Sequence, residues 1–538
     1  MARPLTRHRM VGRYGGTGPG VDRSRPWCPG REPMTQPQRF SAAMPGTLDT
    51  ALRHRLLRDD GQEDICLVTY APSTGATRTS ALVREIVPPE PAERAVHGNA
   101  SFTGDYVVRA ASLAAEQGLG IALAHSHPRG TGWQQMSGPD EDAERSFAHL
   151  AHAITGHDLF GMTLAGNRAW SARRWSAGAH STEAESVRVV DSRLRVTWND
   201  ALRPVPTPQD SQIRTISGWG EQTQGALARL RVLIVGAGSI GHDIAIRLAA
   251  TGLVHVAVMD FDDLERVNLD RMPTATQIDI ALRRSKTEHA LRQLRLAATA
   301  GNPDLHGFEN SICEDLGQRI ALDYDVIFSC VDRPWPRAVL NQLAYSDLIP
   351  VIDGGIAIDA FADGNGMRNA TWRSHVLRPG RPCMVCTRQL DPAEVTLDQQ
   401  GLLEDPEYIR QSERQESARQ NVAALALSPA ASQLAQFISL TVAPGGLGEP
   451  GPLQYVLSTH HLMALPTPLN AECFFEQTTG LGDARVELTN THEAAERTRD
   501  ARRRAQRTTR VRIARAGDML LTSAQHKWAA MTCPAPPH

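Results

Sequence analysis

A glycine-rich turn constrains the fold of this chain more than any other feature. The apolar run at residues 231–235 leads into Gly236, Gly238 and Gly241, and the next apolar run ends at Asp260. Glycines at these spacings let the backbone approach a phosphate at the start of a helix, and a carboxylate about 20 residues further on accepts ribose hydroxyls. The pattern therefore predicts a nucleotide site built on a strand, a turn and a helix.

Apolar runs on either side of this turn predict the fold class. Short runs at 231–238, 255–262, 324–332 and 349–356 alternate with helical segments, which indicates an α/β domain with a parallel, doubly wound sheet. Earlier in the chain, runs at 65–71, 81–87 and 121–127 predict strands, and residues 105–117 and 140–154 predict helices. These earlier elements predict a separate, smaller α/β domain.

The length of 538 residues is too great for one core and predicts several folded units. Residues 1–45 are poor in aliphatic side chains, so we expect a disordered extension. We expect the smaller domain at 46–175, a proline-containing linker at 176–210 and the larger domain at 211–485. Residues 486–538 predict a charged, solvated helical tail to which we assign no chemistry.

Composition and charge narrow the classes of partner. The 57 basic and 59 acidic residues give a net charge of -2, so no global field favours nucleic acid or an anionic membrane. We find neither an apolar run of membrane-spanning length nor a signal peptide, and we expect a cytoplasmic protein. Eight cysteines over this length are too sparse for a disulfide framework. Reduced thiols, a metal pair or a nucleophile remain open.

A metal-binding pattern lies at the end of the run at 121–127. His125 and His127 are two residues apart, and Asp140 follows at the start of a predicted helix. Side chains two residues apart on a strand point to the same side, so both imidazoles can reach one ion and Asp140 can complete the protein ligands. This set leaves a fourth position for water, which zinc activates for attack on an amide carbonyl.

This pattern resembles the JAMM (JAB/MPN) metalloprotease family, in which an upstream Glu precedes His-x-His-Pro and Ser-x-x-Asp. The resemblance implies a small JAMM α/β fold in which His125, His127 and Asp140 bind Zn²⁺. It also implies that Ser137 stabilises the oxyanion and that Glu63 is the general base, with Glu85 as the rival candidate.

The residues after the second apolar run favour ATP over a dinucleotide. The sequence DFDDLERVNLDRM, followed by RRSK, places an Asn, an Arg and a Lys near the phosphates. It resembles the ubiquitin-activating and ThiF/MoeB-like adenylyltransferases, with their Asp-x-Asp, Asn-Leu-x-Arg and Lys. The resemblance implies that Asp260 holds the ribose, and it implies these further roles: phosphate contacts for Asn268 and Arg271, charge neutralisation for Lys286, and Mg²⁺ binding for Asp332. Arg214 aligns with an arginine that reaches the nucleotide of a partner protomer.

One cysteine pair is close in sequence. Cys383 and Cys386 occupy the place where many activating enzymes carry half of a four-cysteine zinc site, and Cys473 lies roughly where the other half begins. A structural zinc prefers four nitrogen or sulfur ligands, so this set is incomplete. A structural zinc, a nucleophile that accepts the adenylated peptide as a thioester, and inert buried thiols all remain open.

Together the two resemblances imply a bifunctional enzyme of a ubiquitin-like protein pathway. A zinc peptidase would trim or deconjugate the ubiquitin-like protein, and an ATP-dependent adenylyltransferase would activate its C-terminal carboxylate for transfer to a conjugating enzyme. The alternative is processing and activation of a sulfur-carrier protein, with a sulfurtransferase as partner, for cofactor or cysteine biosynthesis. Domains of the activating type imply a homodimer.

Overall fold

Two mixed β-sheets organise the described part of the chain. The computed structural model describes residues 38–97, 99–361, 365–411, 422–470 and 472–532. Residues 38–538 belong to one compact unit. The predicted disorder of residues 1–37 lies outside the described residues.

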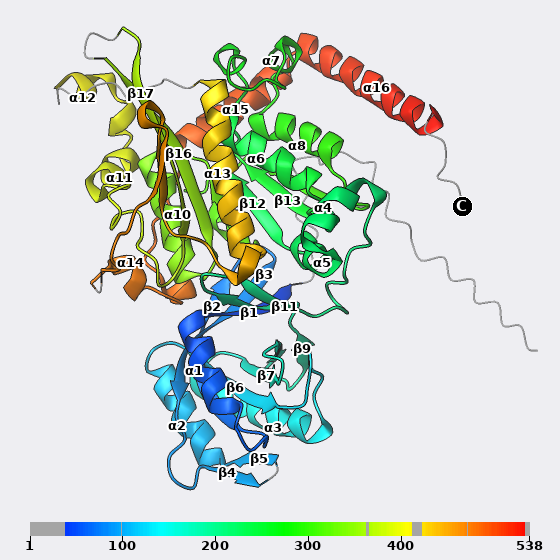
Figure 1. Ribbon diagram of the computed structural model, residues 1–538, viewed down its shortest axis with the longest axis vertical. Helices are drawn as coiled ribbons and strands as arrows, with labels where there is room; N and C mark the ends of the chain where they lie inside the picture. The colour runs from blue at the N-terminus through cyan, green and yellow to red at the C-terminus, as the bar shows by residue number, and fades with distance from the viewer. Residues whose placement is uncertain (1–37, 98, 362–364, 412–421, 471, 533–538) are drawn as a thin grey trace, which may run out of the picture. The chain divides into compact units, whose positions relative to one another are not determined.

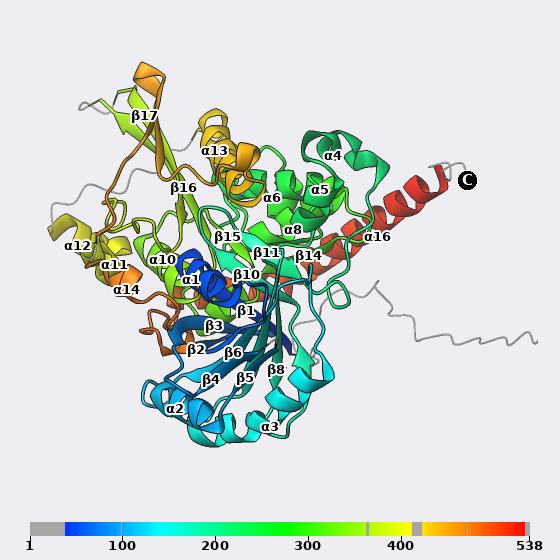
Figure 2. The same ribbon diagram turned by 60° about the horizontal axis from the view of Figure 1, so that its bottom comes forward.

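The first sheet has nine strands in the order β11-β10-β1-β3-β2-β6-β7-β8-β9. Their bounds are β1 (Arg39–Pro45), β2 (Ile65–Thr74), β3 (Arg78–Val87), β6 (Gly120–His127), β7 (Leu159–Ala165), β8 (Trp170–Trp175), β9 (Ser181–Glu183), β10 (Ser186–Val190) and β11 (Arg195–Trp198). A separate hairpin joins β4 (Arg94–His97) to β5 (Asn99–Phe102). Figure 2 shows β1, β3, β2 and β6 side by side.

Helices cover both faces of the first sheet. Leu52 and Leu56 of α1 (Gly46–Leu56) pack on one face, in a cluster with Met44 and Val68. The other face packs against apolar side chains of α2 (Gly104–Ala115) and α3 (Gly138–Thr155). This arrangement places β6 and the start of α3 together, and those elements carry the predicted zinc ligands.

The second sheet has eight strands in the order β14-β13-β12-β15-β16-β17-β18-β19. Their bounds are β12 (Arg231–Val235), β13 (His255–Met259), β14 (Asp304–Phe308), β15 (Val326–Ser329), β16 (Val351–Ala360), β17 (Met367–Leu377), β18 (Leu453–Val456) and β19 (His461–Ala464). The first five strands in this order are parallel, and the last three join antiparallel. The parallel strands follow the order expected of a doubly wound sheet, which confirms the predicted Rossmann-like domain.

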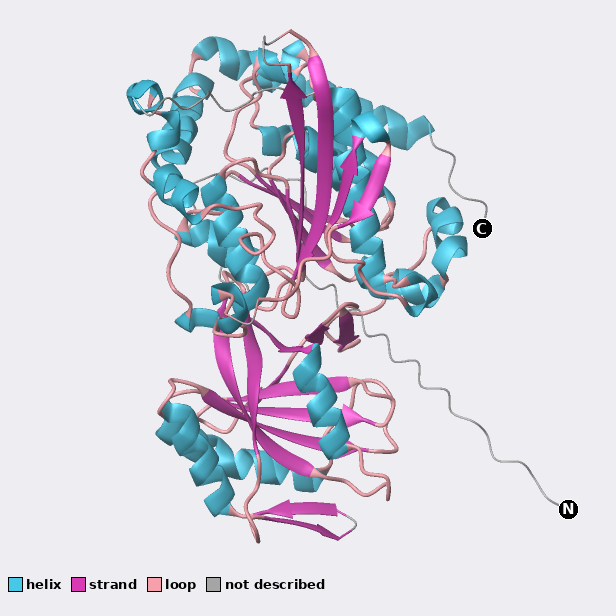
Figure 3. Ribbon diagram, turned by 60° about the vertical axis from the view of Figure 1, so that its left-hand side comes forward, coloured by secondary structure: helices cyan, strands magenta, loops and turns pink. Residues whose placement is uncertain are grey.

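Alternate residues of β12 face opposite helical layers. Val232 and Ile234 pack with α5 (Glu221–Ala228), α6 (Ser239–Ala250) and α8 (Lys286–Ala297), whereas Leu233 and Val235 pack with α9 (Asp315–Ala321) and α10 (Pro334–Ser346). Figure 1 and Figure 3 show helices on both sides of this sheet. Because both faces are covered, its parallel strands are continuous apolar runs in the sequence. The remaining helices are α4 (Ile213–Trp219), α7 (Gln277–Ala281), α11 (Pro392–Gln399), α12 (Pro406–Gln411), α13 (Ala423–Thr441), α14 (Phe474–Gln477), α15 (Glu493–Gln506) and α16 (Thr509–Thr532).

Among the described residues, α13 is the one helix long and apolar enough to cross a membrane by length and composition. Core helices of soluble proteins pass the same test. Ala430, Phe437 and Leu440 of α13 are buried against the second sheet and α6, and this packing accounts for its apolar residues.

The observed elements differ from the predicted boundaries in two places. Strand β1 lies inside the predicted extension, and β10 and β11 lie inside the predicted linker. Strand β1 pairs in parallel with both β3 and β10. Parallel pairing across such sequence separations leaves no local turn signal for β1, and β10 and β11 have only five and four residues.

The predicted solvated tail is wrong for α15. Ala495 and Arg502 of this helix are buried, although the rest of its surface is mostly exposed. Arg502 pairs with Asp263 and Glu309, and Arg499 pairs with Glu314. The charged side chains of this helix therefore form ion pairs with loops of the second sheet as well as contacting solvent.

A buried charge cluster joins the two sheets. Asp325, just before β15, accepts hydrogen bonds from Arg78 Nη1 of β3 at 2.5 Å and from Arg188 Nη1 of β10 at 3.1 Å. It also accepts the backbone N–H of Arg231 at 3.0 Å, and the Arg231 guanidinium pairs with Glu185. Burial opposes the charge on Asp325, but the surrounding arginines outweigh it and hold the pKa of Asp325 below its usual range.

Replacement of this central carboxylate is expected to destabilise the chain. Asp325→Asn leaves the buried Arg78 and Arg188 without their shared anion, and loss of one partner of a buried ion pair costs about 3–5 kcal/mol. We expect a clearly lower midpoint of urea unfolding, followed by tryptophan fluorescence. Asp500→Asn is the matched control, because Asp500 is exposed and its carboxylate pairs with Arg503 of its own helix. Equal midpoints for the two variants would contradict this account.

Candidate functional site

The predicted glycine turn connects β12 to α6 and leaves the start of that helix open. Gly236 has a φ of +96°, and a Cβ atom there would lie 2.4 Å from the carbonyl oxygen of Cys330. A Cβ on Gly241 would lie 1.9 Å from the carbonyl oxygen of Gly236, whereas nothing lies within 4 Å of one on Gly238. The first and third glycines are therefore required by packing, and Gly238 faces open space at the N-terminus of α6.

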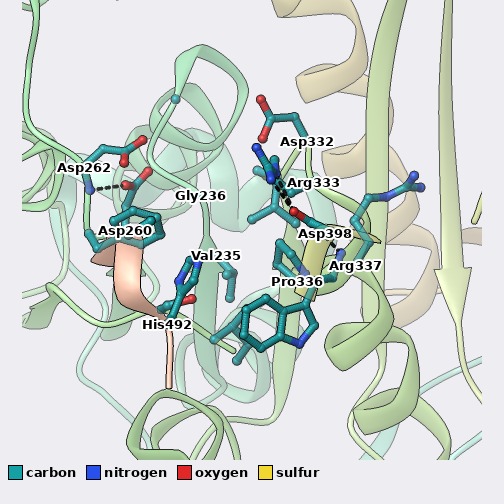
Figure 4. A pocket seen from close by; sticks show the side chains of 18 of the residues that line it. Val235, Gly236, Asp260, Asp262, Asp332, Arg333, Pro336, Arg337, Asp398 and His492 are labelled. Carbon is teal, nitrogen blue, oxygen red and sulfur yellow. Dashed lines mark hydrogen bonds and ion pairs between the residues drawn. The ribbon is translucent and has the colours of Figure 1, made fainter. Parts of the chain in front are cut away.

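Asp260 fixes this turn from the end of β13. Its carboxylate accepts the backbone N–H of Ala237 at 2.7 Å and that of Asp262 at 2.8 Å. Figure 4 shows Asp260 and Asp262 beside Gly236. Burial raises the pKa of Asp260, although the charge of Lys286 opposes that shift. The side chain predicted to hold ribose thus also anchors the phosphate-binding turn.

Lys286 is the first residue of α8 and faces the same carboxylates. Its Nζ atom lies 2.6 Å from Oδ2 of Asp262. Burial alone would lower the pKa of Lys286, but the charges of Asp260 and Asp262 outweigh it and raise this pKa. The ammonium group is therefore charged at neutral pH and is available to an anion in the same cavity.

Asn268 and Arg271 lie on the loop between β13 and α8. The buried Asn268 accepts the backbone N–H of Glu265 through Oδ1 at 2.8 Å, and Arg271 donates from Nη1 to the carbonyl oxygen of Val267 at 2.7 Å. Both contacts shape the loop itself. Asp332 follows β15 on the other side of the turn and is exposed.

These elements surround one cavity of about 1530 Å³. Seven predicted residues line it: Gly236, Gly238, Asp260, Asn268, Arg271, Lys286 and Asp332. Gly241 lies beneath the turn, and the exposed Arg214 on α4 does not line the cavity. Acidic Asp332 at the end of β15 and cationic Lys286 at the start of α8 suit a magnesium–phosphate group between them.

Several lining residues were not predicted. Asn310 to Ile312 and Gly354 to Ile356 follow or continue neighbouring strands of the parallel sheet, and the rule that ligands bind at the carboxyl ends of such strands would have found them. His492 also lines the cavity, just before α15. No sequence motif links it to this cavity.

The predicted zinc ligands converge in the first domain. His125 Nε2 and His127 Nε2 are 3.3 Å apart, and they lie 3.7 and 3.5 Å from Oδ2 of Asp140. The three ligand atoms all lie within 4.8 Å of one another. Two imidazole nitrogens and one carboxylate oxygen so close together fit the donor set of a three-ligand zinc site.

The protonation of His125 and Asp140 suits metal binding, whereas the raised pKa of His127 favours an imidazolium that a metal ion would have to deprotonate. Burial lowers the pKa of His125 to about 3, so its imidazole is neutral. A hydrogen bond to Asp140 raises the pKa of His127. Burial opposes the charge on Asp140, but the histidines and Ser137 outweigh it and lower that pKa.

Glu63, rather than Glu85, interacts with the histidines through its charge. Glu63 precedes β2 and is partly buried, and burial raises its pKa while the charge of His127 lowers it. Glu85 is exposed on β3. The charge interaction with His127 therefore favours Glu63 as the carboxylate near the cluster.

Ser137 caps the helix that carries Asp140. Its Oγ atom donates to Oδ2 of Asp140 at 2.7 Å, and its backbone N–H donates to the same oxygen at 3.2 Å. In this structure Ser137 orients the third ligand, and its predicted role at an oxyanion stays a prediction.

A buried ion pair supports the cluster and was missed from the sequence. Arg173 of β8 pairs with Glu144 of α3 and donates to Thr163 Oγ1 at 3.0 Å. Thr163 Oγ1 lies 3.4 Å from Nε2 of His125. Glu144 lies one helical turn after Asp140, so the sequence spacing places both side chains on one face of the helix. Its partner Arg173 lies on a strand that follows the helix, and no sequence pattern links the two.

The three predicted cysteines also meet. Cys383, Cys386 and Cys473 place their sulfur atoms within 4.8 Å of one another, and the Sγ atoms of Cys383 and Cys473 are 3.5 Å apart. Burial raises the pKa of Cys383 to about 12, which disfavours a free thiolate nucleophile. Glu476, three residues after Cys473, accepts the backbone N–H of Gly380 at 2.9 Å. The triad is compatible with zinc.

Comparisons with known proteins support the second domain. Residues 209–450 match the ThiF family. A protein of Drosophila willistoni named adenylyltransferase and sulfurtransferase MOCS3 is 31% identical over 141 residues, which are 26% of this chain and 30% of that protein. The Culex quinquefasciatus protein of the same name is 28% identical, over 26% of this chain and 31% of its own length. The match thus spans about 30% of the length of these relatives.

The comparison with solved structures also found matches. A crystal structure of E. coli MccB with ATP is 17% identical with a TM-score of 0.39, and the match covers 50% of this chain and 74% of that one. The E. coli tRNA N6-threonylcarbamoyladenosine dehydratase TcdA is 21% identical with a TM-score of 0.25, over 30% of this chain and 68% of that one. The family match, the parallel sheet and the glycine turn agree, and residues 209–450 of this chain form a ThiF family domain.

Proposed function

We propose that the ThiF domain uses ATP and Mg²⁺ to adenylate the C-terminal carboxylate of a small carrier protein. The observation that carries this proposal is the single cavity shared by the open turn at Gly238, Asp260, Lys286 and Asp332. The family match and the word adenylyltransferase in the relatives' names support the same reaction.

The residues of the cavity suit attack of a carboxylate on the α-phosphate. Both reactants are anions, so the transition state needs fixed positive charge. Lys286 and Arg271 supply that charge, and the open N-terminus of α6 adds backbone donors for the phosphates. Asp332 would hold Mg²⁺, which neutralises phosphate charge when bound. The carrier carboxylate gains an AMP group, and pyrophosphate leaves.

We propose a sulfur-carrier protein as the first substrate to test. The MOCS3 relatives are named both adenylyltransferase and sulfurtransferase, which favours sulfur transfer over conjugation. A sulfurtransferase would then consume the adenylate. The alternative partners are a ubiquitin-like protein and a conjugating enzyme, and the two cases differ in whether the carrier ends as a thiocarboxylate or as an amide conjugate. Arg214 would reach a nucleotide only in a homodimer, which is part of the proposal.

A second proposed function is a zinc peptidase of the JAMM type in the first domain. The observation that favours it is the convergence of His125, His127 and Asp140, with Glu63 beside them. Zinc, when bound, would lower the pKa of a water ligand and polarise the scissile carbonyl. The raised pKa of Glu63 suits a carboxylate that accepts a proton near neutral pH. Such a site would trim the carrier to its free C-terminus.

ATP–pyrophosphate exchange tests the adenylation. With the carrier present, Asp332→Ala should reduce exchange at least about 100-fold, because loss of a group that stabilises transition-state charge typically costs 10²–10³ in rate. His127→Ala should retain exchange, because His127 lies in the other domain. Equal loss in both variants would contradict two separate sites, and full exchange in Asp332→Ala would contradict the role of this carboxylate.

Zinc content tests the histidine cluster. His127→Ala removes one of three ligands, and we expect elemental analysis of the purified chain to show the loss of one zinc equivalent relative to wild type. His149→Ala is the matched control, because His149 is an exposed histidine of α3. Wild-type and His127→Ala chains with the same zinc content would show that the cluster is an ion pair without a metal.

The cysteine triad predicts a second bound zinc ion, independently of the histidine cluster. Cys383→Ala should remove a second zinc equivalent that His127→Ala leaves in place, and it should lower the thermal midpoint because a structural zinc stabilises the fold. Cys66→Ala, in the core of the first domain, should leave the zinc content unchanged. A wild-type chain with a single zinc equivalent, lost only in His127→Ala, would refute zinc at the triad.

A further inference from the structure

The segment from Asn490 to Thr498 forms one wall of the nucleotide cavity. Asn490, Thr491, His492 and Arg497 are among its lining residues. This segment lies after residue 450, where the ThiF family match ends. The family match therefore assigns it no part in nucleotide binding.

Ion pairs and a backbone hydrogen bond hold this segment against the loop after β14. The backbone N–H of Asn490 donates to the carbonyl oxygen of Cys313 at 2.9 Å. Arg499 donates to Glu314 at 2.8 Å and to the carbonyl oxygen of Glu309 at 3.1 Å. The segment is thus attached at the edge of the parallel sheet that β14 forms.

The fold determines which part of a nucleotide reaches that edge. Phosphates bind at the glycine turn after β12, and ribose binds at Asp260 after β13. The base then continues away from the turn, toward the loop after β14. Asn490 and His492 lie at this end of the cavity, because Asn490 bonds to Cys313 and His492 contacts Phe261, the residue after Asp260.

His492 is held in one orientation by two aromatic rings. Its ring centroid lies 5.0 Å from that of Phe261 at an interplanar angle of 88°, and 5.1 Å from that of Trp335 at 78°. Figure 4 shows His492 below Asp260. Its Nδ1 atom is buried and has no hydrogen-bond partner among the described residues. A nitrogen shielded in this way cannot meet a ligand in the cavity, so the other ring nitrogen of His492, Nε2, is the one that a ligand can reach.

The charge state of His492 is suited to a neutral ligand group. Burial lowers the pKa of His492, and the nearby Glu314 and Asp398 only partly offset that shift. The imidazole is therefore neutral at physiological pH, so it can accept or donate one hydrogen bond at Nε2.

We infer that Asn490–Thr498 is the wall of the adenosine end of the nucleotide site and that His492 positions ATP through a hydrogen bond between Nε2 and the adenosine moiety. This inference rests on the proposed function, because it requires ATP in the cavity. It adds a nucleotide-binding residue from a part of the chain outside the family match.

The role of His492 is tested by calorimetric titration of the full chain with ATP and with inorganic tripolyphosphate, both with Mg²⁺. Tripolyphosphate lacks base and ribose, so only ATP reaches His492. His492→Leu should weaken ATP binding about 5- to 10-fold, as expected for one lost hydrogen bond, and should leave tripolyphosphate binding unchanged. His492→Gln retains a polar atom near the Nε2 position and should lose less than about half of that effect. His461→Leu, at an exposed histidine of β19, is the matched control and should match wild type.

The outcomes separate this inference from the proposed function. Equal weakening of both ligands in His492→Leu, or none for ATP, would overturn the inference while leaving an ATP site in place. Equal affinities of His492→Leu and His492→Gln would refute the hydrogen bond at Nε2. A wild-type chain that binds neither ligand would instead overturn the proposed function.

Discussion

The contact between the glycine turn and the two strands beside it determines the rest of the nucleotide site. Gly236 passes so close to the backbone of Cys330 that a side chain there would meet it, and Asp260 holds the next residue of the turn through its backbone N–H. These contacts join the ends of β12, β13 and β15. The start of α6, the ribose carboxylate and Asp332 consequently face one cavity, and Lys286 reaches it through Asp262.

Buried charge constrains how the two sheets pack against each other. Asp325 is paired with arginines from β3 and β10, so strands of the first domain end against the sheet of the ThiF domain. A buried carboxylate is tolerated only when its partners are fixed, and this requirement limits how the two sheets pack. Both candidate sites thus belong to one unit of the chain, residues 38–538. A carrier protein trimmed at one site would find the activating site on the same molecule.

The sequence predicts features whose partners are near in the chain or recur in a known order. The glycine turn, the strand that carries His125 and His127, and the parallel strands have local patterns of this kind. Strand β1 does not, because it pairs with segments far away in the chain, and β10 and β11 form a local antiparallel pair of only five and four residues. His492 is a similar case: its role depends on Phe261 and Trp335, which lie in two other parts of the sequence. The charged composition of α15 predicts a solvated helix, but its arginines form ion pairs with carboxylates on the loops around the cavity.

Adenylation makes one requirement that other uses of ATP do not: a carboxylate oxygen must become part of AMP. A carrier protein whose C-terminal carboxylate is labelled with heavy oxygen, incubated with this chain, ATP and an acceptor thiol, measures that transfer by mass spectrometry of the released nucleotide. The account predicts AMP that carries one labelled oxygen and pyrophosphate that carries none. Unlabelled AMP, or ADP together with labelled phosphate, would contradict it.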